Sequence, residues 1–421
     1  MSLYDAPQAE RTHIGFFGVR NAGKSSVVNA VTGQSLAVVS PVAGTTTDPV
    51  RKTMELLPIG PVLIIDTPGI DDEGELGALR VKKTRRVLDS TDIAVLVIDA
   101  LRGKTEADRQ LIALFQERQI PYVLAYNKCE LLPGDGSAPR EFGAATGDDE
   151  RELQPDLVPP RGALYVSAKE GRNIGDLKEM IGQLVRRDEP ERHVVSDLVA
   201  PGDNVVLVTP IDSAAPKGRL ILPQQMTLRD LLDAGVLAHV VRETELAALL
   251  DALKQPPALV VTDSQAFGVV SRIVPPQVPL TSFSILFARY KGNLASEVAG
   301  ANELDALHDG DTVLLAEGCT HHRQCDDIGT VKMPKWIAAY TGADLRYEFT
   351  SGGEFPDDLS RYKLVVHCGG CMLNAREMRW RIRHAAAQGI PLTNYGVLIA
   401  KMNGILPRVL SPFGTGALAG K

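Results

Sequence analysis

Eight residues near the N-terminus, Gly18-Val-Arg-Asn-Ala-Gly-Lys-Ser25, constrain the fold of this chain more than any other feature. They follow an apolar run at residues 13–19 and precede a helical pattern at residues 26–32. In a P-loop of this kind, glycines allow backbone N–H groups to surround phosphates, and the helix N-terminus adds the positive end of its dipole. We expect Lys24 to reach the β- and γ-phosphates and Ser25 to bind Mg²⁺. The pattern therefore predicts a nucleotide-binding site between a strand and a helix.

Short apolar runs alternate with helical patterns over residues 13–187, which is typical of an α/β domain with a mainly parallel sheet. The expected strands lie at residues 13–19, 62–66, 93–99, 122–127 and 163–167. Residues 133–162 interrupt this alternation, because they are rich in Pro, Gly, Asp and Glu and lack apolar periodicity. We expect them to form a surface loop.

Two segments divide the rest of the chain. The charged residues 185–193 and the Pro-rich residues 274–279 are each typical of a linker. We therefore predict three α/β domains, at residues 11–187, 188–273 and 274–413. The small central domain carries no catalytic constellation, which favours a role in association. The third domain is expected to begin with a strand at residues 282–287. Compared residue by residue, the sequence indicates no internal repeat.

The charge balance limits the partners of the chain. Its 421 residues include 45 Lys and Arg against 52 Asp and Glu, a formal net charge of −7, which argues against general nucleic-acid binding. No apolar run approaches the roughly 20 residues that span a bilayer, and the first residues lack the pattern of a signal peptide. We therefore expect a cytoplasmic protein that binds neither membrane nor nucleic acid. In a reducing compartment its five cysteines are not expected to form disulfides.

The other motifs of a guanine-nucleotide switch follow the P-loop in order. The run Asp66-Thr-Pro-Gly69 ends an apolar strand, so we expect Asp66 to support Mg²⁺ through water and Gly69 to donate its amide to the γ-phosphate. Thr46 is the expected second protein ligand of Mg²⁺. Two loops at strand ends, residues 127–130 and 167–169, are expected to bind the base. Together these motifs resemble the translation-factor-like GTPases, particularly the tRNA-modification and Era-like branch.

This resemblance implies a set of site residues. The expected nucleotide-binding residues are Gly18, Asn21, Ala22, Gly23, Lys24, Ser25, Ser26, Asn127, Lys128, Glu130, Ser167, Ala168 and Lys169. The expected catalytic residues are Lys24, Thr46 and Gly69, and the expected Mg²⁺ ligands are Ser25, Thr46 and Asp66. Cys129 is expected to pack behind the base-binding loop.

Two positions depart from the usual pattern. Glu130 stands where such GTPases usually have Asp, and its longer carboxylate can still accept two hydrogen bonds from guanine, worth roughly 1.5–3 kcal/mol each. We therefore expect GTP as the substrate, with a weakened preference for guanine. Ile70 replaces the Gln that positions water in Ras-like proteins, and Asn21 matches the residue that binds K⁺ in the related branch. Since a monovalent cation can stabilise transition-state charge, we expect slow hydrolysis that K⁺ stimulates.

Four of the five cysteines lie in the last quarter of the chain, beside histidines. Cys319-Thr-His-His322 follows an apolar strand at residues 312–316, and Cys368-Gly-Gly-Cys371 follows another at residues 363–367. Sites in open α/β sheets usually lie where strands end and helices begin. The amides of the Gly-Gly turn are expected to face the cysteine sulfurs. The spacing leaves open a redox dithiol, a structural zinc site, or three thiolates that hold a 4Fe–4S cluster.

The GTPase motifs, the segment at residues 210–219, and the pattern Cys-x-His, 46 residues, Cys-x-x-Cys together resemble the FeFe-hydrogenase maturation GTPase family, HydF. The likeness extends from about residue 13 to about residue 413. It implies a GTPase domain, a dimerisation domain and a cluster-binding domain in that order, and hence a homodimer, with larger assemblies through exposed sheet edges left open. It also implies a scaffold that receives a di-iron precursor from two radical-SAM maturases and delivers it to apo-FeFe-hydrogenase.

The same resemblance implies the ligands of the cluster. Cys319, Cys368 and Cys371 would hold the 4Fe–4S cluster, and His321 matches the labile fourth position, with His322 or His367 as alternatives. The implied cofactors are GTP, Mg²⁺, K⁺, the 4Fe–4S cluster and a transient di-iron subcluster.

Two other functions stay open at this point. An RNA-modification or ribosome-assembly GTPase with an appended zinc-binding module would share the GTPase motifs, but it predicts zinc and a basic surface. The second is a redox sensor, in which the state of the cluster controls the GTPase.

Basic residues crowd the helix expected after Cys371, which predicts either a solvated face or a surface for an anionic cargo. They are Arg376, Arg379, Arg381, Arg383 and His384.

Overall fold

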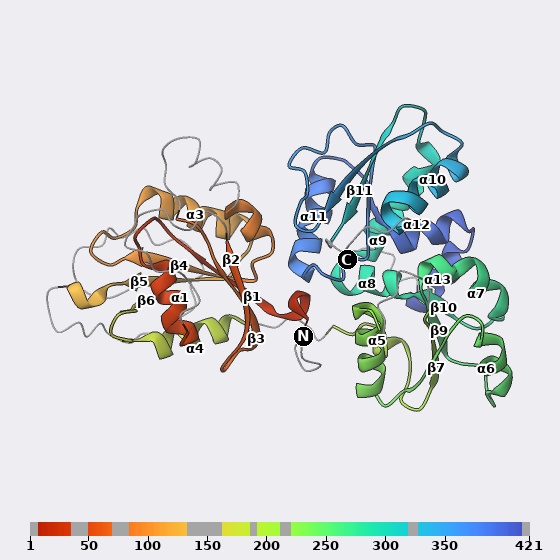
Figure 1. Cartoon of the computed structure of the whole chain (residues 1–421), viewed down its shortest axis with the longest axis horizontal. Coiled ribbons are helices and arrows are strands. Elements are labelled where there is room, and N and C mark those ends of the chain that lie inside the picture. Colours follow the sequence, from red (N-terminus) through yellow and green to blue (C-terminus); the bar gives the residue numbers. More distant parts are fainter. Residues whose placement is uncertain are drawn as a thin grey trace. The chain divides into compact units, whose positions relative to one another are not determined.

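The computed structural model describes residues 7–34, 49–69, 84–132, 162–185, 192–210, 220–318 and 327–414. The chain forms two compact units, Met1–Glu189 and Pro190–Lys421, and each has its own α/β sheets (Figure 1). The α/β class predicted from the sequence is therefore confirmed. Among the described residues, no helix is both long and apolar enough to cross a membrane.

The N-terminal unit is built on a six-stranded sheet with the order β2-β3-β1-β4-β5-β6. Its strands are β1 (Thr12–Phe17), β2 (Val50–Leu56), β3 (Gly60–Asp66), β4 (Ile93–Asp99), β5 (Tyr122–Asn127) and β6 (Ala163–Tyr165). The sheet is parallel except for β2, which runs antiparallel to β3 at the edge. The mainly parallel sheet predicted for this domain is confirmed.

Helices cover both faces of this sheet. Helices α1 (Lys24–Thr32) and α4 (Ile174–Val185) pack on one face, and α3 (Glu106–Glu117) packs on the other (Figure 1). Glycines with left-handed φ values of +89° and +66°, Gly23 and Gly33, flank α1. The β1–α1 connection is therefore a sharp turn at the end of a buried strand, which is the arrangement that a P-loop requires.

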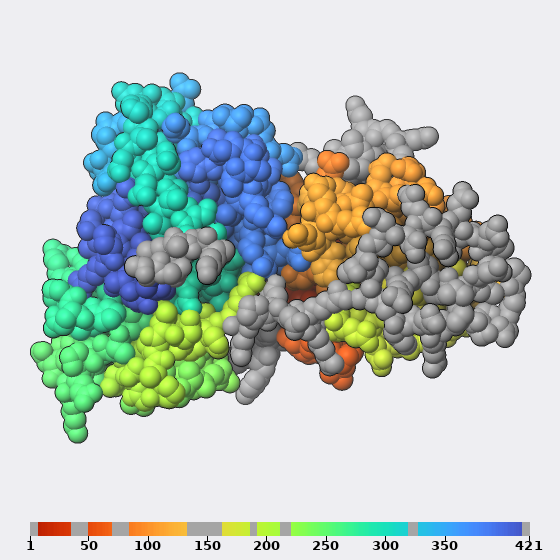
Figure 2. Space-filling view, turned by 180° about the vertical axis from the view of Figure 1, so that it is seen from behind, coloured from red at the N-terminus to blue at the C-terminus, as the bar shows by residue number. Residues whose placement is uncertain are grey.

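The second unit contains two parallel four-stranded sheets. The first module, residues 202–292, holds β7 (Asn204–Val208), β8 (Leu237–Val241), β9 (Leu259–Thr262), β10 (Leu280–Ser282), α5 (Leu222–Asp233), α6 (Leu246–Ala252), α7 (Phe267–Ile273) and α8 (Phe283–Lys291). The second module, residues 310–404, holds β11 (Thr312–Glu317), β12 (Arg346–Ser351), β13 (Leu364–His367), β14 (Leu392–Asn394), α10 (Met333–Thr341), α11 (Ala375–Ala387) and α12 (Tyr395–Met402). Helices α9 (Leu294–Asn302) and α13 (Leu406–Leu410) follow the two modules. One hydrophobic core runs through both modules, which form a continuous body in Figure 2.

The two modules are copies of one design. Their sheet orders are β8-β7-β9-β10 and β12-β11-β13-β14, so that each places its strands in the order second, first, third, fourth. The sequences agree in register, because residues 279–292 and 391–404 share the pattern Pro-Leu-Thr-x-(Phe/Tyr)-x-(Ile/Val)-Leu-x-Ala-(Arg/Lys)-x-x-Gly. The strands β9 and β13 both begin Leu-Val-Val. The prediction that the chain holds no internal repeat was therefore wrong.

Equivalent positions of the two modules meet. Ser284 and Gly396 occupy the same place in the shared pattern, and they face each other where α8 packs on α12. A Cβ atom on Gly396 would lie 2.7 Å from Cβ of Ser284, so this close approach requires glycine. The two helices therefore pack with almost no space between their first turns.

Residues 282–287 were predicted as a strand, but they begin helix α8. The hydroxyl of Ser282 accepts a hydrogen bond from the amide of Ile285 at 3.3 Å and caps the helix. The strand in this region is β10, which ends where α8 begins. It follows residue 273, the predicted end of the second domain, but pairs in parallel with β9, which precedes that residue. The strand prediction was wrong because a short continuous apolar run occurs in both buried helices and buried strands.

Helix α9 buries a carboxyl group against the second sheet. Gly300 lies so close to β14 that a Cβ atom there would be 2.1 Å from the carbonyl oxygen of Leu392. One turn earlier, Glu297 is completely buried near Asn394, and burial raises its pKa to about 8, an effect that the Asn394 side chain opposes only in part. Glu297 is therefore largely protonated at neutral pH in the folded chain.

Replacing Glu297 with glutamine is expected to stabilise the chain above neutral pH. The unfolded chain releases this proton near pH 4.5, whereas the folded chain holds it to about pH 8, so stability falls as pH rises between these values. Over this pH range the free energy of unfolding falls by at most about 4 kcal/mol. Thermal unfolding of Glu297→Gln should match the parent near pH 5 and exceed it by several degrees at pH 8. A constant difference in Tm between the two proteins across this range would contradict the assignment.

Candidate nucleotide and cluster sites

The P-loop connects β1 to α1 and makes two close contacts that only glycine permits. A Cβ atom on Gly18 would lie 2.2 Å from the carbonyl oxygen of Val97, and one on Gly23 would lie 2.2 Å from Nδ2 of Asn127. Within the loop, the buried Lys24 donates hydrogen bonds from Nζ to the carbonyls of Gly18 and Val19 at 3.0 and 2.9 Å. The ammonium group is thus directed into the loop that is expected to hold phosphates.

Two of the expected Mg²⁺ ligands are in contact. Ser25 donates a hydrogen bond from Oγ to Oδ2 of Asp66 at 2.8 Å. Burial raises the pKa of Asp66, while the Ser25 hydrogen bond and the Lys24 charge oppose the shift in part. Oδ1 of Asp66 is buried and has no hydrogen-bond partner among the described residues. A hydroxyl beside a carboxylate with an unused oxygen suits Mg²⁺, which prefers oxygen ligands.

Gly69 packs directly on the P-loop. A Cβ atom at this position would lie 2.9 Å from Cα of Arg20, so a side chain at position 69 would collide with the P-loop backbone. The backbone of Gly69 is therefore held beside the loop, where its expected donation to the γ-phosphate requires it. Thr46 and Ile70 lie outside the described residues.

The expected base-binding loops are tied to the P-loop by side chains. Asn127, which is buried, donates from Nδ2 to the carbonyl of Ala22 and accepts at Oδ1 from the amide of Ala168, both at 3.1 Å. Lys128 donates from Nζ to the carbonyl of Asn21 at 2.7 Å. Asn21 itself is exposed and adopts a left-handed φ of +62°. The structure thus brings together three of the motifs that the sequence singled out.

Asp99 belongs to this network but was missed by the sequence analysis. Its Oδ2 accepts a hydrogen bond from Nζ of Lys128 at 2.6 Å. Burial alone would raise the pKa of Asp99, but hydrogen bonds from Lys128 and from the Leu101 amide outweigh it and lower the pKa. The one signal for this role is the position of Asp99 at the end of β4.

Glu130 lies in a short 3-10 turn, Cys129–Leu131, that follows β5. Its Oε2 is buried and has no hydrogen-bond partner among the described residues. Such an oxygen is available to accept N–H groups from a base. Cys129 is buried, as predicted, and its amide bonds to the carbonyl of Val166 at 3.2 Å. In the neighbouring loop, Oγ of Ser167 is buried and accepts from the amide of Glu170.

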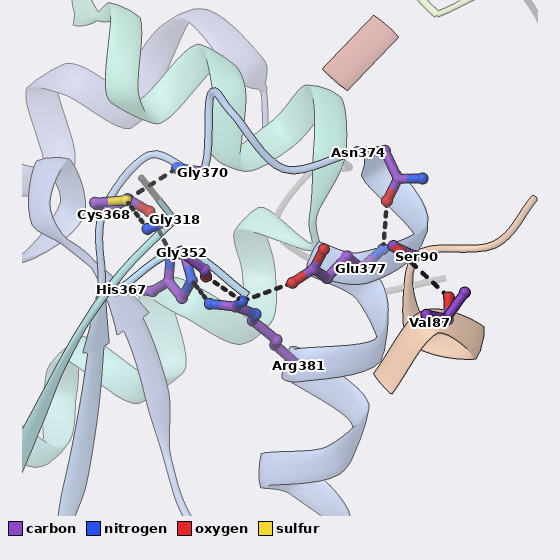
Figure 3. Close-up of polar contacts among 10 residues, drawn as sticks. All are labelled: Val87, Ser90, Gly318, Gly352, His367, Cys368, Gly370, Asn374, Glu377 and Arg381. Carbon is purple, nitrogen blue, oxygen red and sulfur yellow. Dashed lines mark hydrogen bonds and ion pairs between the residues drawn. The ribbon is translucent and has the colours of Figure 1, made fainter. Parts of the chain in front are cut away.

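The cysteine turn stands where the strand order of the second module reverses, between the ends of β11 and β13. Figure 3 shows Sγ of Cys368 facing the amides of Gly318 at 3.0 Å and Gly370 at 3.5 Å. Of the two amides of the Gly-Gly turn that were expected to face sulfur, that of Gly370 does so, and the second donor, Gly318, follows β11 and was not predicted. Gly370 has a left-handed φ of +60°, and a Cβ there would meet Sδ of Met378 at 2.6 Å. Switch points of this kind are the usual ligand sites of open sheets.

Cys371, like Cys368, is partly buried. Burial raises its pKa to about 11, Cys368 adds to the shift, and the charge of Lys291 opposes it. Lys291 comes from α8 of the first module, and no local sequence signal pointed to it. The other expected ligands, Cys319, His321 and His322, lie outside the described residues together with Cys325.

His367 is fully buried, and both of its ring nitrogens are engaged (Figure 3). Nε2 lies 2.9 Å from Nη1 of Arg381, and Nδ1 lies 2.7 Å from the carbonyl oxygen of Cys368. Because arginine can only donate, Nε2 accepts and Nδ1–H donates. To act as a cluster ligand, His367 would have to give up one of these bonds.

Arg381 lies inside the protein, whereas a solvated or cargo-binding face was expected. It is completely buried, and besides His367 it bonds Glu377 at 2.6 Å and the carbonyl of Gly352 at 2.8 Å. The expectation failed at this position because Arg381 falls on the core-facing side of α11. Among the described residues, no group of three or more His, Cys, Asp or Glu side chains gathers to hold a metal ion.

Comparison with known families covers most of the chain. Residues 194–292 match the hydrogen maturase F dimerization domain, and residues 295–412 match the hydrogen maturase F tetramerization domain. Residues 13–128 match the 50S ribosome-binding GTPase family. The chain therefore carries a GTPase domain followed by two self-association domains.

Individual relatives resemble the N-terminal part. The tRNA modification GTPase MnmE of Synechococcus sp. (strain JA-3-3Ab) is 35% identical over 183 residues, which is 42% of this chain and 35% of that protein. GTPase Der of Lactobacillus delbrueckii subsp. bulgaricus (strain ATCC BAA-365 / Lb-18) is 28% identical over 212 residues, 48% of this chain and 47% of that protein. The chain thus spans about a third to a half of the length of these relatives. Era from Aquifex aeolicus, bound to GDP and AlF4⁻, covers 62% of this chain and 97% of its own, at 18% identity and a TM-score of 0.34.

The relatives support GTP hydrolysis with Mg²⁺ in the N-terminal domain, where Lys24, Ser25 and Asp66 already stand in contact with the P-loop or with each other. The two C-terminal matches are specific to one family of hydrogenase maturation GTPases. A dimerization domain follows the GTPase domain, as expected, and the domain expected to bind a cluster matches a tetramerization domain. With this combination of domains, the chain belongs to the hydrogen maturase F family, HydF.

Proposed function

We propose that this chain is a GTP-hydrolysing scaffold that holds a 4Fe–4S cluster, receives a di-iron precursor of the hydrogenase H-cluster, and delivers it to apo-FeFe-hydrogenase. The observation that carries the proposal is the cysteine turn at the switch point of the second module, where two backbone amides donate to Sγ of Cys368. Amide donors of this kind stabilise thiolates that bind iron.

The cluster ligands in this proposal are Cys319, Cys368 and Cys371. His321 is the proposed labile fourth ligand, with His322 as the alternative, because both nitrogens of His367 already have partners. A cluster with one weakly held position supplies an iron that an incoming cyanide-bearing unit can bind. The protein's own part is to hold the cysteine turn, in which Cys371 is partly buried.

In the N-terminal domain we propose that Lys24 and the amide of Gly69 stabilise charge on the γ-phosphate, while Ser25, Asp66 and Thr46 hold Mg²⁺. Asn21 is the proposed K⁺ ligand, and slow turnover that K⁺ stimulates follows from it. In this proposal, GTP hydrolysis controls when the chain exchanges one partner protein for another. The proposed partners are two radical-SAM maturases and apo-FeFe-hydrogenase, in the cytoplasm and without nucleic acid.

The competing function is an RNA-modification or ribosome-assembly GTPase with a zinc module, and metal content separates the two. We would reconstitute the anaerobically purified chain with iron and sulfide, then measure its metals and the EPR spectrum of the reduced form. About four irons per chain with a low-spin signal support the scaffold. Stoichiometric zinc without that signal would overturn it.

Replacing Glu130 with glutamine is expected to weaken GTP binding about 100-fold. The amide cannot reproduce two charge-assisted hydrogen bonds to guanine, worth roughly 1.5–3 kcal/mol each. Xanthosine triphosphate carries a carbonyl in place of the guanine amino group, so it should bind the variant better than the parent. Calorimetric titration with both nucleotides measures the change, with the exposed Glu170→Gln as the control. Unchanged GTP affinity in Glu130→Gln would remove Glu130 from the base site.

We also propose that the first module associates with a second copy of the chain through β8. This strand ends the sheet order, and its Leu237 and Val240 are 55% and 41% exposed. Exposed apolar edge strands favour pairing with another chain. Changing both residues to lysine should lower the mass measured by light scattering to that of a smaller assembly. The control is Leu57→Lys, an exposed leucine in the N-terminal unit; an unchanged mass in the double variant would exclude this edge.

A further inference from the structure

Lys291 is a buried lysine that connects the two modules. It is the last residue of α8 in the first module, and it is only 2% exposed. Its Nζ donates hydrogen bonds to the carbonyl oxygens of Cys371 at 3.2 Å and Leu373 at 2.9 Å, both in the second module. The ammonium also lies 5.4 Å from the ring centre of Phe287, one turn earlier. Lysine is almost never buried without such partners, so this arrangement is specific.

The two cysteines of the turn are held in parallel ways. The carbonyl of Cys368 accepts from Nδ1 of His367, which Arg381 orients from behind. The carbonyl of Cys371 accepts from Lys291. Each backbone carbonyl is therefore fixed by a buried side chain, but the partner of Cys371 comes from a different module, 80 residues away in the sequence.

The position of Lys291 also places a positive charge beside the sulfur sites. Three thiolates and a cluster carry a net negative charge, which increases when the cluster is reduced. A cation in a poorly solvated position stabilises the more negative state, since charges interact more strongly where water is excluded. The ammonium group thus acts on the turn in two ways, through hydrogen bonds and through charge.

We propose that Lys291 is a positioning residue of the cluster site: it fixes the Cys371 end of the turn and raises the reduction potential of the cluster bound there. This inference rests on the proposed cluster function. It makes the dimerisation module a contributor to the iron site, so that any displacement of α8 changes the position of a ligand.

Three substitutions separate the two effects. Lys291→Arg keeps the charge and the donors, Lys291→Gln keeps a donor without the charge, and Lys291→Met removes both. The matched control is Lys401→Met, in the equivalent helix of the second module, whose ammonium binds Asp305 and Asn302 instead. Thermal unfolding of each variant identifies any that do not fold.

The measurements are made on the full chain with and without the cluster. In the reconstituted protein, an EPR-monitored titration should give a more negative reduction potential for Lys291→Gln and Lys291→Met, while Lys291→Arg and Lys401→Met match the parent. Iron release to a chelator should be about tenfold faster in Lys291→Met, the effect of losing one hydrogen bond from a charged donor. In the cluster-free chain, hydrogen exchange at residues 368–374 should rise in Lys291→Met alone.

The outcomes distinguish this inference from the proposed function. If the parent chain binds no iron–sulfur cluster, the proposed function fails. If the parent binds the cluster but Lys291→Gln and Lys291→Met keep its potential, iron-release rate and exchange pattern, only the role of Lys291 is overturned. Where Lys291→Met does not fold, the comparison of Lys291→Gln with Lys291→Arg decides the contribution of the charge.

Discussion

Lys24→Ala is expected to reduce GTP hydrolysis by about 100- to 1000-fold, the usual effect of removing a group that stabilises transition-state charge. Lys24 is directed into the P-loop, where its Nζ bonds the carbonyls of Gly18 and Val19. Alanine leaves the glycine turns and the helix unchanged, so nucleotide should still bind, though more weakly. Phosphate release under single-turnover conditions measures the loss.

The same variant tests whether the two units depend on each other. Because Lys24 lies in the N-terminal unit, Lys24→Ala should hold as much iron after reconstitution as the parent. The control is Lys52→Ala, an exposed residue of β2, which should change neither hydrolysis nor iron content. Iron loss in Lys24→Ala would show that cluster binding requires an intact nucleotide site.

Cys371→Ser is expected to abolish the cluster and leave nucleotide binding intact. Serine has nearly the shape of cysteine, but its hydroxyl is not ionised at neutral pH and is a poor ligand for iron. The site then has too few thiolates to hold four irons. Iron content and the EPR signal should both fall to background, while the Kd for GTP stays within about twofold of the parent value.

Cys325→Ser is the matched control for that experiment, since the sequence assigns this cysteine no ligand role. It should keep four irons per chain. A cluster that survives in Cys371→Ser and disappears in Cys325→Ser would reverse the assignment of the ligands.

The motifs of the N-terminal site could be singled out in the sequence because nucleotide chemistry requires fixed residue types at fixed spacing, and the structure brings the P-loop and the two expected base-binding loops together. Gly23 and Lys24 can be recognised without any knowledge of the core. The edge strand β2, by contrast, was missed, because most of its residues are exposed and carry no apolar alternation. Strand β12, another edge, was also missed: its Tyr347 and Phe349 alternate with polar residues, but none of its residues is fully buried.

Residues that act through distant contacts left no local signal. Asp99 contacts a lysine 29 residues away, and Lys291 contacts a turn 80 residues away. Arg381 is one of several arginines on α11, and only packing distinguishes it from Arg383 on the same helix, which is exposed. The repeat escaped notice because the modules agree in the pattern of residue types more than in identity, and it became evident once the sheet orders were known.

The contact between Ser284 and Gly396 has a consequence for the history of the chain. In a symmetric dimer, a residue touches its own counterpart only at the twofold axis. Helices α8 and α12 meet in this way, which is the arrangement of two identical subunits that have been fused end to end. Thr262 and Asp263 then occupy the places of His367 and Cys368. In two modules related in this way the sheet ends after β9 and β13 are equivalent positions, and of the two only the end after β13 carries cysteines.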